Sequence, residues 1–351
     1  MRELAGIEVP KVDEAARAKA AERVEQLLMP RRALGRLLEL GEKIAGITGY
    51  DTMDLGRKMV VVMAGDHGVT AEGVSAYPSE VTGQMVRGFA AGVAAINVLC
   101  RHSGIEVRVV DMGCAADLSD LVAKGVLLDA KVGPGTRNMR TGPAMSRQEA
   151  VTCIERGAGI AREMAKSGVR MLGTGDMGIG NTTPSTAIAS VAAGVPVSRI
   201  AGRGTGIDDA GLARKVKVIE DSISINKPLK SDPVGVLAGV GGYEIGGIAG
   251  LVLGAAESRI PVVIDGVIST AGAAIAWLLE PRVADYLFAA HRSVEEAQSA
   301  MLSVMGLVPI LDLGMRLGEG TGCALAMPII EAGAKVIREM ATFEEAGVSH
   351  G

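Results

Sequence analysis

Two hydrophobic patterns alternate along most of the chain. Short runs of β-branched and other apolar residues, each ending at a turn-forming residue such as Gly or Asp, lie at 59–63, 106–111, 169–172, 262–265 and 308–311. Alanine-rich stretches with helical spacing lie between them, at 79–102, 147–167, 183–193, 208–225, 242–256, 269–279 and 293–304. Strand-like runs that alternate with helices are typical of βαβ units and a parallel sheet.

Both ends of the chain have a helical pattern instead. Residues 12–28 are charged and alanine-rich, and residues 29–47 carry leucines at helical spacing, with Pro30 separating the two stretches. The last segment, 324–346, returns to helix. Helices from both ends are therefore expected to form a smaller cap.

These patterns predict a doubly wound α/β fold with a mostly parallel sheet. We expect a large α/β ligand-binding domain over 57–320, and a small helical cap or dimerisation domain formed by 1–56 plus 321–351. In doubly wound folds the ligand binds beyond the carboxyl ends of the strands. The candidate functional residues are therefore those that directly follow the apolar runs.

Composition narrows the class of protein. Glycine accounts for 48 of 351 residues, about twice its ordinary share, without a G-X-Y period, and 48% of residues are hydrophobic. Collagen and disorder are therefore excluded. The net charge is −4, the charges are scattered, and aromatic residues make up only 2%. These values exclude a basic nucleic-acid stripe with stacking platforms and favour a small ligand.

The cysteines and the apolar segments point to a cytoplasmic protein. Cys100, Cys114, Cys153 and Cys323 form no CxxC motif, so a zinc ribbon or a redox dithiol is not expected. No signal-peptide stretch opens the chain, and the longest uncharged span contains many polar residues. The most apolar helical runs fall short of the roughly 20 residues that a membrane span needs. We expect reduced thiols and no membrane contact.

Familiar nucleotide and catalytic motifs are missing. Gly202-Arg-Gly204 and Gly318-Glu-Gly320 lack the third glycine of GxGxxG, because Ile207 and Cys323 stand in its place. The chain has no Walker A lysine, GxSxG elbow or HExxH motif, and its four histidines lie far apart. A dinucleotide-binding site and a histidine-rich metal site are therefore not expected.

Four glycine-rich segments stand out instead, at 64–70, 173–184, 201–210 and 313–322. Glycine lets backbone amides approach an anion, and a helix that begins next adds its positive end. Asn181 and the two threonines after it resemble such a helix start. Thr205 and Asp208 suggest another, with Lys215 about two turns further on. These segments are therefore candidate phosphate loops.

Single polar residues in these segments are candidates for chemistry. Glu319 stands between two glycines, where few neighbours shield it from a ligand, and this favours a general base. Asp265 follows a β run and is either an acid that faces the site or a turn former. For Asp66-His67 we favour a structural role in a turn. Methionines 85, 177 and 315 lie beside the glycine-rich loops and are candidates for the wall of a flat aromatic pocket.

Taken in order, these loops resemble one family. The motifs are Ala64-Gly-Asp-His-Gly-Val, the stretch 72–85, Gly175-Asp-Met-Gly-Ile-Gly-Asn-Thr-Thr, Gly202-Arg-Gly-Thr-Gly and Arg316-Leu-Gly-Glu-Gly-Thr-Gly. They resemble nicotinate-nucleotide–dimethylbenzimidazole phosphoribosyltransferases from about residue 60 to the C-terminal tail. The resemblance implies a Rossmann-like large domain and a homodimer. It also implies transfer of the phosphoribosyl group of nicotinate mononucleotide to 5,6-dimethylbenzimidazole or a related base, giving α-ribazole 5′-phosphate and nicotinate for assembly of the cobalamin nucleotide loop.

The resemblance also implies site residues. Its general base falls on Glu319, and a second acidic position, where the family commonly has Glu, falls on Asp176, which is one methylene shorter. The implied phosphate and ribose contacts are Gly178, Gly180, Asn181, Thr182, Gly204, Thr205 and Lys215. The implied base-binding residues are Pro78, Ser79, Gln84, Met85 and Leu317. No cofactor and no metal are implied.

This chemistry agrees with the residues on physical grounds. The pyridine nitrogen of nicotinate mononucleotide is already cationic and leaves as a neutral ring, so no general acid and no Mg²⁺ on a pyrophosphate are needed. A single carboxylate that removes the acceptor proton contributes typically 10²–10⁴-fold. Attack opposite the leaving group inverts the anomeric carbon.

Three rival functions fit the residues less well. A transferase that uses phosphoribosyl pyrophosphate requires a metal-binding acidic pair, and Asp208-Asp209 fits this poorly because it follows a glycine loop rather than a long β run. A non-catalytic nucleotide-binding protein would have lost Glu319 or the phosphate loops. A dehydrogenase lacks its glycine fingerprint here.

Overall fold

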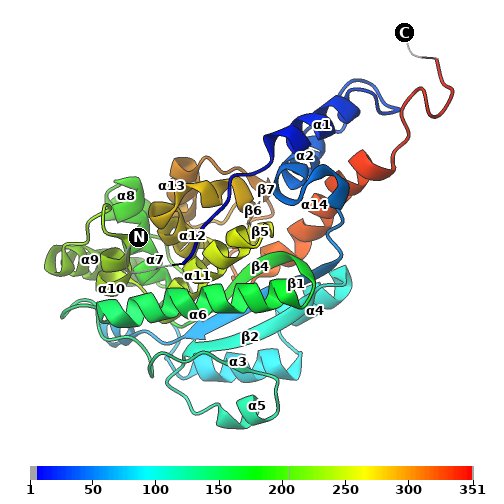
Figure 1. The fold of residues 1–351 in the computed structure, drawn as a ribbon. Helices are drawn as coiled ribbons and strands as arrows, with labels where there is room; N and C mark the ends of the chain where they lie inside the picture. Colours follow the sequence, from blue (N-terminus) through cyan, green and yellow to red (C-terminus); the bar gives the residue numbers. More distant parts are fainter. Residues whose placement is uncertain (1–5, 205, 350–351) are drawn as a thin grey trace.

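Seven parallel strands form one sheet, in the order β3-β2-β1-β4-β5-β6-β7, in the computed structural model (Figure 1). The structure describes residues 6–204 and 206–349. The strands are β1 Arg57–Gly65, β2 Glu106–Gly113, β3 Leu128–Asp129, β4 Val169–Met177, β5 Val262–Ile264, β6 Leu287–His291 and β7 Pro309–Leu311. The chain moves outward from β1 to β3 and then in the other direction from β4 to β7, so the predicted doubly wound fold is confirmed.

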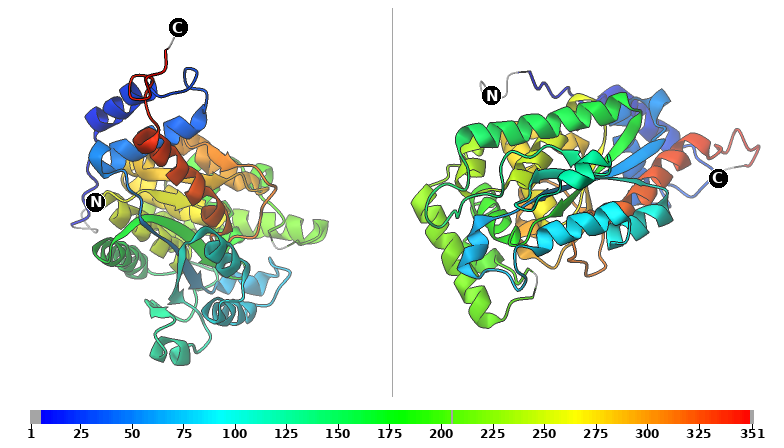
Figure 2. Two further views of the ribbon diagram at one scale, coloured as in Figure 1. Left: turned by 90° about the vertical axis from the view of Figure 1, so that its right-hand side faces the viewer. Right: turned by 90° about the horizontal axis from the view of Figure 1, so that it is seen from below.

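Helices cover both faces of the sheet, as Figure 2 shows from below. Helices α3, α4 and α14 pack on one face, and α6, α11 and α12 on the other. The longer helices are α1 Glu14–Val24, α2 Arg36–Thr48, α3 Val81–Ala91, α4 Ala95–Ser103, α6 Arg147–Lys166, α7 Thr182–Ala193, α9 Asp209–Asn226, α10 Pro233–Val240, α11 Tyr243–Glu257, α12 Val267–Leu279, α13 Glu296–Met305 and α14 Thr321–Glu339. Short helices are α5 Ser119–Ala123 and α8 Val197–Ile200.

The β runs expected from the sequence are strands in the structure, but β3 and β6 were not expected. The segment expected as one helix over 79–102 is two helices, α3 and α4, because the chain turns at Gly92 with φ 76°. Taken together, 81–103 is long and apolar enough to cross a membrane. The break at Gly92 and the ion pair between Arg87 and Asp120 argue against such a span.

The terminal helices pack together beside the sheet. Helix α14 runs from the sheet toward α2, and α1 packs on α2 (Figure 1). Gly41 of α2 and Gly333 of α14 allow this close approach, because a Cβ on Gly41 would lie 2.5 Å from the carbonyl oxygen of Gly333. The division into a large domain over 57–320 and a small helical one stays a prediction.

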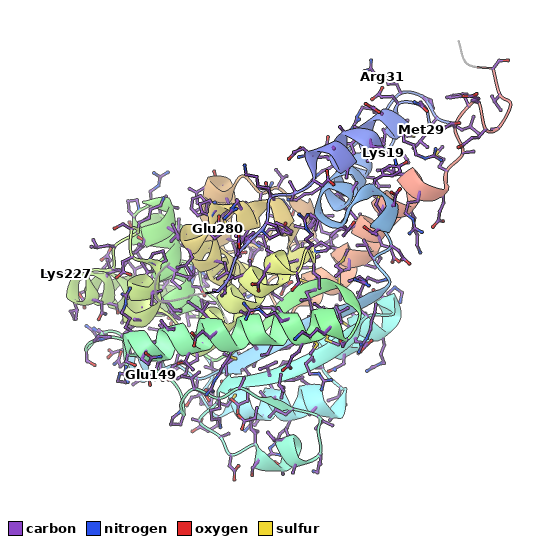
Figure 3. All side chains as sticks on the ribbon, viewed as in Figure 1. Lys19, Met29, Arg31, Glu149, Lys227 and Glu280 are labelled. Atoms are coloured by element: carbon purple, nitrogen blue, oxygen red, sulfur yellow. The ribbon has the colours of Figure 1, made fainter. Side chains whose placement is uncertain are left out.

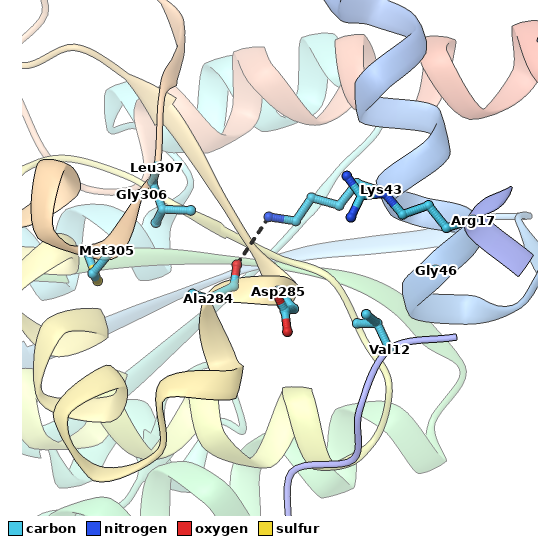
Figure 4. Close-up of a pocket in the computed structure, with 9 residues that line it drawn as sticks. All are labelled: Val12, Arg17, Lys43, Gly46, Ala284, Asp285, Met305, Gly306 and Leu307. Carbon is cyan, nitrogen blue, oxygen red and sulfur yellow. Dashed lines mark hydrogen bonds between the residues drawn. The ribbon is translucent and has the colours of Figure 1, made fainter. Parts of the chain in front are cut away.

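Lys43 links α2 to the large α/β part (Figure 4). Its ammonium donates hydrogen bonds to the carbonyl oxygens of Ala284 (3.1 Å) and Leu287 (2.6 Å) and lies 4.9 Å from the centre of the Phe288 ring. Burial lowers the pKa of Lys43 to about 8. A cavity of about 220 Å³ beside it is lined by Arg17 among others. These contacts fix how the terminal helices dock.

Sequence signals explain where several helices begin. Ser146 caps α6 in a capping box, accepting from the Glu149 backbone N–H while the Glu149 carboxylate accepts from the N–H of Ser146 (2.6 Å). Glu149 lies at the first turn of that helix (Figure 3). Asp208 caps α9 by accepting from Gly211 (2.8 Å). Such caps satisfy backbone donors that a helix start leaves unpaired.

Candidate active site

A cavity of about 650 Å³ opens at the carboxyl ends of β4, β5 and β6. This is the position expected for the ligand of a doubly wound sheet. Its wall combines apolar side chains with a few polar ones. The lining residues are Tyr77, Val81, Met85, Asp176, Met177, Gly178, Ile179, Asn181, Thr182, Gly204, Gly266, Val267, Ile268, His291, Ser293, Glu295, Arg316, Leu317, Gly318 and Glu319.

Glu319 lies on a tight loop at the start of α14. Its own φ is 64°, and those of Gly318 and Gly320 are 82° and 92°, so three consecutive residues are left-handed. A non-glycine residue in this region is strained and persists only where its surroundings hold it. Asp265 supplies that support, since its carboxylate accepts hydrogen bonds from the backbone N–H groups of Gly320 (3.0 Å) and Gly322 (2.7 Å).

The loop also rests directly on β4. A Cβ on Gly175 would lie 2.4 Å from the carbonyl oxygen of Glu319, so only glycine allows the loop to pack this closely. Glu319 is 6% exposed, and its Oε2 accepts from the Ile96 backbone N–H at the start of α4 (3.3 Å). Burial raises the pKa of Glu319 above its ordinary value, although this hydrogen bond opposes the change. A carboxylate with a raised pKa is a better proton acceptor.

Asp176 faces the same cavity from the end of β4. Its Oδ2 accepts from the Asn181 side-chain amide (3.1 Å), and Oδ1 has no hydrogen-bond partner among residues 6–204 and 206–349. Burial raises the pKa of Asp176 well above its ordinary value, and the nearby charges of Asp265 and Glu244 raise it further. A raised pKa favours the protonated form of a carboxyl group, which can donate a hydrogen bond.

One end of the cavity, formed by Thr182 and Gly204 with Lys215 behind them, is where the sequence predicts the phosphate to bind; we call it the phosphate end. The Lys215 side chain is fully buried on α9, and its ammonium donates to Thr182 Oγ1 (2.9 Å) and to the carbonyl oxygen of Gly202 (3.0 Å). Thr182 is the first residue of α7, so the positive end of that helix points to the same region. Burial lowers the pKa of Lys215 to about 8, while Glu295 opposes the change.

The structure brings many of the expected site residues together and leaves others outside the cavity wall. Those that line it are Met85, Asp176, Gly178, Asn181, Thr182, Gly204, Leu317 and Glu319. Lys215 lies behind Thr182, and Gly180 packs against Thr70. Pro78, Ser79 and Gln84 lie on the turn before α3 and on α3 itself, beside the cavity rather than in its wall. Thr205 lies outside the described residues.

Other candidates have structural roles. His67 is buried behind the loop of Gly178, and its Nε2 is 2.7 Å from Glu244 Oε1. Burial alone would lower the pKa of His67, but Glu244 raises it above its ordinary value. Asp66 accepts from the Ala115 backbone (2.8 Å). Both side chains therefore bond distant segments, His67 to the start of α11 and Asp66 to the loop after β2, and their role in a turn stays a prediction.

The acidic pair Asp208-Asp209 does not face the cavity. Asp208 caps α9 through Gly211, and Asp209 forms an exposed ion pair with Arg203. Among the residues that the structure describes, no group of three or more His, Cys, Asp and Glu side chains could hold a metal ion.

Three lining residues come from a region where the sequence predicted no strand. His291 ends β6, and Ser293 and Glu295 follow it before α13 begins. The run Leu287–His291 is short, and it lies in the gap between the helical stretches 269–279 and 293–304. Strict alternation of helices and strands calls for a strand in that gap, and this signal would have placed His291 at the carboxyl edge of the sheet.

Comparisons with known proteins agree with this geometry. A family model described as phosphoribosyltransferase matches residues 9–348. A nicotinate-nucleotide–dimethylbenzimidazole phosphoribosyltransferase from Geotalea uraniireducens is 55% identical over 340 residues, 97% of this chain and 96% of the relative. The chain belongs to this phosphoribosyltransferase family. An enzyme of the same name from Syntrophobacter fumaroxidans is also 55% identical, over 95% of this chain and 94% of the relative.

The fold of the family is also the fold of this chain. The crystal structure of a phosphoribosyltransferase of that name from Thermus thermophilus matches with a TM-score of 0.90 and 43% identity, covering 97% of this chain and 100% of the other. The protein is therefore an enzyme of the phosphoribosyltransferase class. The resemblance noted in the sequence motifs is confirmed over nearly the whole chain.

Proposed function

We propose that this phosphoribosyltransferase transfers the phosphoribosyl group of nicotinate mononucleotide to 5,6-dimethylbenzimidazole or a related base. The products are α-ribazole 5′-phosphate and nicotinate. The observation that carries the proposal is Glu319, a buried carboxylate on a strained loop in the wall of the cavity. The same cavity is lined by Thr182, to which the buried Lys215 donates, and this is where we place the phosphate. The names of the relatives support the same reaction.

Glu319 acts as the general base in this proposal. The acceptor base lies against the apolar wall near Met85 and Leu317, with its N–H toward the carboxylate. As the other ring nitrogen attacks C1′ of the ribose, Glu319 takes the proton. The bond from C1′ to the pyridinium nitrogen breaks on the opposite face, and its electron pair leaves with nicotinate. A single displacement of this kind inverts the anomeric carbon from β to α.

The remaining polar residues hold the nucleotide in line. Lys215 supplies positive charge, and Thr182 and Gly178 offer a hydroxyl and a backbone amide near the start of α7. Asp176, in its protonated form, assists by donating to a ribose oxygen or to a water. Holding both substrates in the attack geometry contributes effective concentration.

We also infer that the enzyme is a cytoplasmic homodimer, as the family resemblance implies. The segment 81–103 is divided into two helices, which supports a location away from the membrane. Light scattering on the purified protein is expected to give twice the chain mass, whereas a monomer mass would contradict the dimer.

The reaction is tested by incubating the protein with nicotinate mononucleotide and a panel of bases, with mass detection of products. We expect a product with the mass of α-ribazole 5′-phosphate and an equal amount of nicotinate. NMR of its anomeric proton identifies the α configuration. Absence of any ribosylated base, or a product of β configuration, would contradict the proposal.

A further inference from the structure

Glu295 lines the cavity, but the proposed reaction assigns it no role. It occupies the N-cap position of α13, shortly after β6, and its side chain is 6% exposed. Its Oε1 accepts a hydrogen bond from the Gly204 backbone N–H (2.9 Å). It therefore joins the loop after β6 to the glycine loop at the proposed phosphate end.

The second carboxylate oxygen of Glu295 has no donor in the described part of the chain. Oε2 is buried and has no hydrogen-bond partner among residues 6–204 and 206–349. The glycine loop passes close to this oxygen, because a Cβ on Gly202 would lie 2.0 Å from it. Only glycine at position 202 leaves room for the carboxylate. A buried oxygen of an acidic group that lacks a donor is unfavourable. Since Glu295 lines the cavity, a ligand is well placed to supply the donor.

The neighbours of Glu295 indicate which part of the substrate this is. Lys215 contacts the same loop, donating to the carbonyl oxygen of Gly202 and to Thr182 Oγ1. The phosphate belongs beside these donors, and the reacting carbon C1′ belongs near Glu319 in the same cavity. The ribose connects the two. A phosphate dianion carries only acceptors, whereas a ribose carries two hydroxyl donors.

We propose that Glu295 Oε2 accepts a hydrogen bond from a ribose hydroxyl of the nucleotide substrate. This inference rests on the proposed function, because it takes a ribose 5′-phosphate as the ligand. Glu295 then has two roles at once, holding Gly204 through Oε1 and recognising ribose through Oε2. A site that bonds a substrate hydroxyl rejects the analogue that lacks it, so Glu295 makes the enzyme selective for ribonucleotides.

The test is a comparison of dissociation constants measured by calorimetry, which requires no turnover. The ligands are nicotinate mononucleotide and its 2′-deoxy and 3′-deoxy analogues, and the proteins are the wild type, Glu295→Gln and Glu296→Gln. Glu296 is the exposed neighbouring carboxylate and serves as the matched control. We expect the wild type and Glu296→Gln to bind one deoxy analogue about 10- to 100-fold more weakly, as for a hydrogen bond to a charged group.

In Glu295→Gln that penalty is expected to shrink several-fold, because the amide is a weaker acceptor than the carboxylate. An unchanged penalty would overturn the proposal even if overall affinity falls, since a residue that only supports the loop weakens all three ligands equally. Tighter binding of inorganic phosphate and of all three nucleotides by Glu295→Gln, without loss of selectivity, would show instead that the carboxylate merely occupies the anion site.

If the variant does not fold, the affinities of the wild-type enzyme for the three nucleotides still test the proposal. Equal affinity of the wild-type enzyme for all three nucleotides would overturn the proposal without any substitution. Failure of the proposed function has a different signature, namely absence of the ribosylated product with any base. Ribose selectivity in binding is measured independently of that outcome.

Discussion

Replacing Gly175 by alanine tests whether the backbone of β4 sets the position of the catalytic loop. The added Cβ would lie 2.4 Å from the carbonyl oxygen of Glu319 and 2.7 Å from its carbonyl carbon, where ordinary contacts begin at 3.4 Å. The Glu319 backbone must therefore move by about 1 Å, and a displacement of that size can reduce a rate about 10²-fold. Overpacking of this kind also destabilises a core by about 1–3 kcal/mol.

The assay is steady-state turnover with both substrates, together with thermal unfolding. We expect Gly175→Ala to remain folded, with kcat reduced about 10²-fold and KM for the nucleotide little changed, because the phosphate end is untouched. Gly159→Ala is the control, since no atom lies within 4 Å of the added Cβ on α6. A folded Gly175→Ala enzyme with wild-type kcat would refute the idea that this contact positions Glu319.

Further outcomes are expected for Asp176, for Lys215 and for removal of metal ions. Asp176→Ala is expected to reduce kcat less than Glu319→Gln, and Asp176→Glu to be tolerated; equal losses with full non-additivity in the double variant would mean that both carboxylates share the proton. KM for the nucleotide is expected to rise as the pH increases through about 8, where Lys215 loses its charge. Lys215→Ala should raise that KM at lower pH and remove the dependence, with KM for the base unchanged; a rise confined to the base would contradict the phosphate assignment. Exhaustive EDTA treatment is expected to leave the rate unchanged, and a rate that collapses and recovers with Mg²⁺ would favour a pyrophosphate-dependent reaction.

Much of the fold and the site could be predicted because both depend on local patterns. Long apolar runs such as 59–63 become β strands buried on both faces, and the glycine-rich segments 64–70, 173–184 and 313–322 lie at or after the carboxyl ends of such strands. Parallel strands bring those carboxyl ends together, so Asp176 and Glu319 line one cavity although they are distant in sequence.

The parts that escaped prediction depend on packing between distant segments. Residues 287–291 are too short a run to read as a strand alone, yet β6 pairs with β5 and β7. The role of Asp265 was open because the sequence could not show that it binds the Gly320 and Gly322 amides. The Ile96 N–H contact with Glu319 likewise depends on the turn at Gly92, which divides one expected helix into two.

The central claim is that Glu319 removes the acceptor proton, and Glu319→Gln tests it most directly. The amide retains the shape of the side chain and loses the basicity. The decisive measurement is the single-turnover rate of transfer from nicotinate mononucleotide to 5,6-dimethylbenzimidazole in this variant beside the wild type. We predict a rate lower by roughly 10²–10⁴-fold, with both substrates still bound. A rate close to that of the wild type would contradict the account.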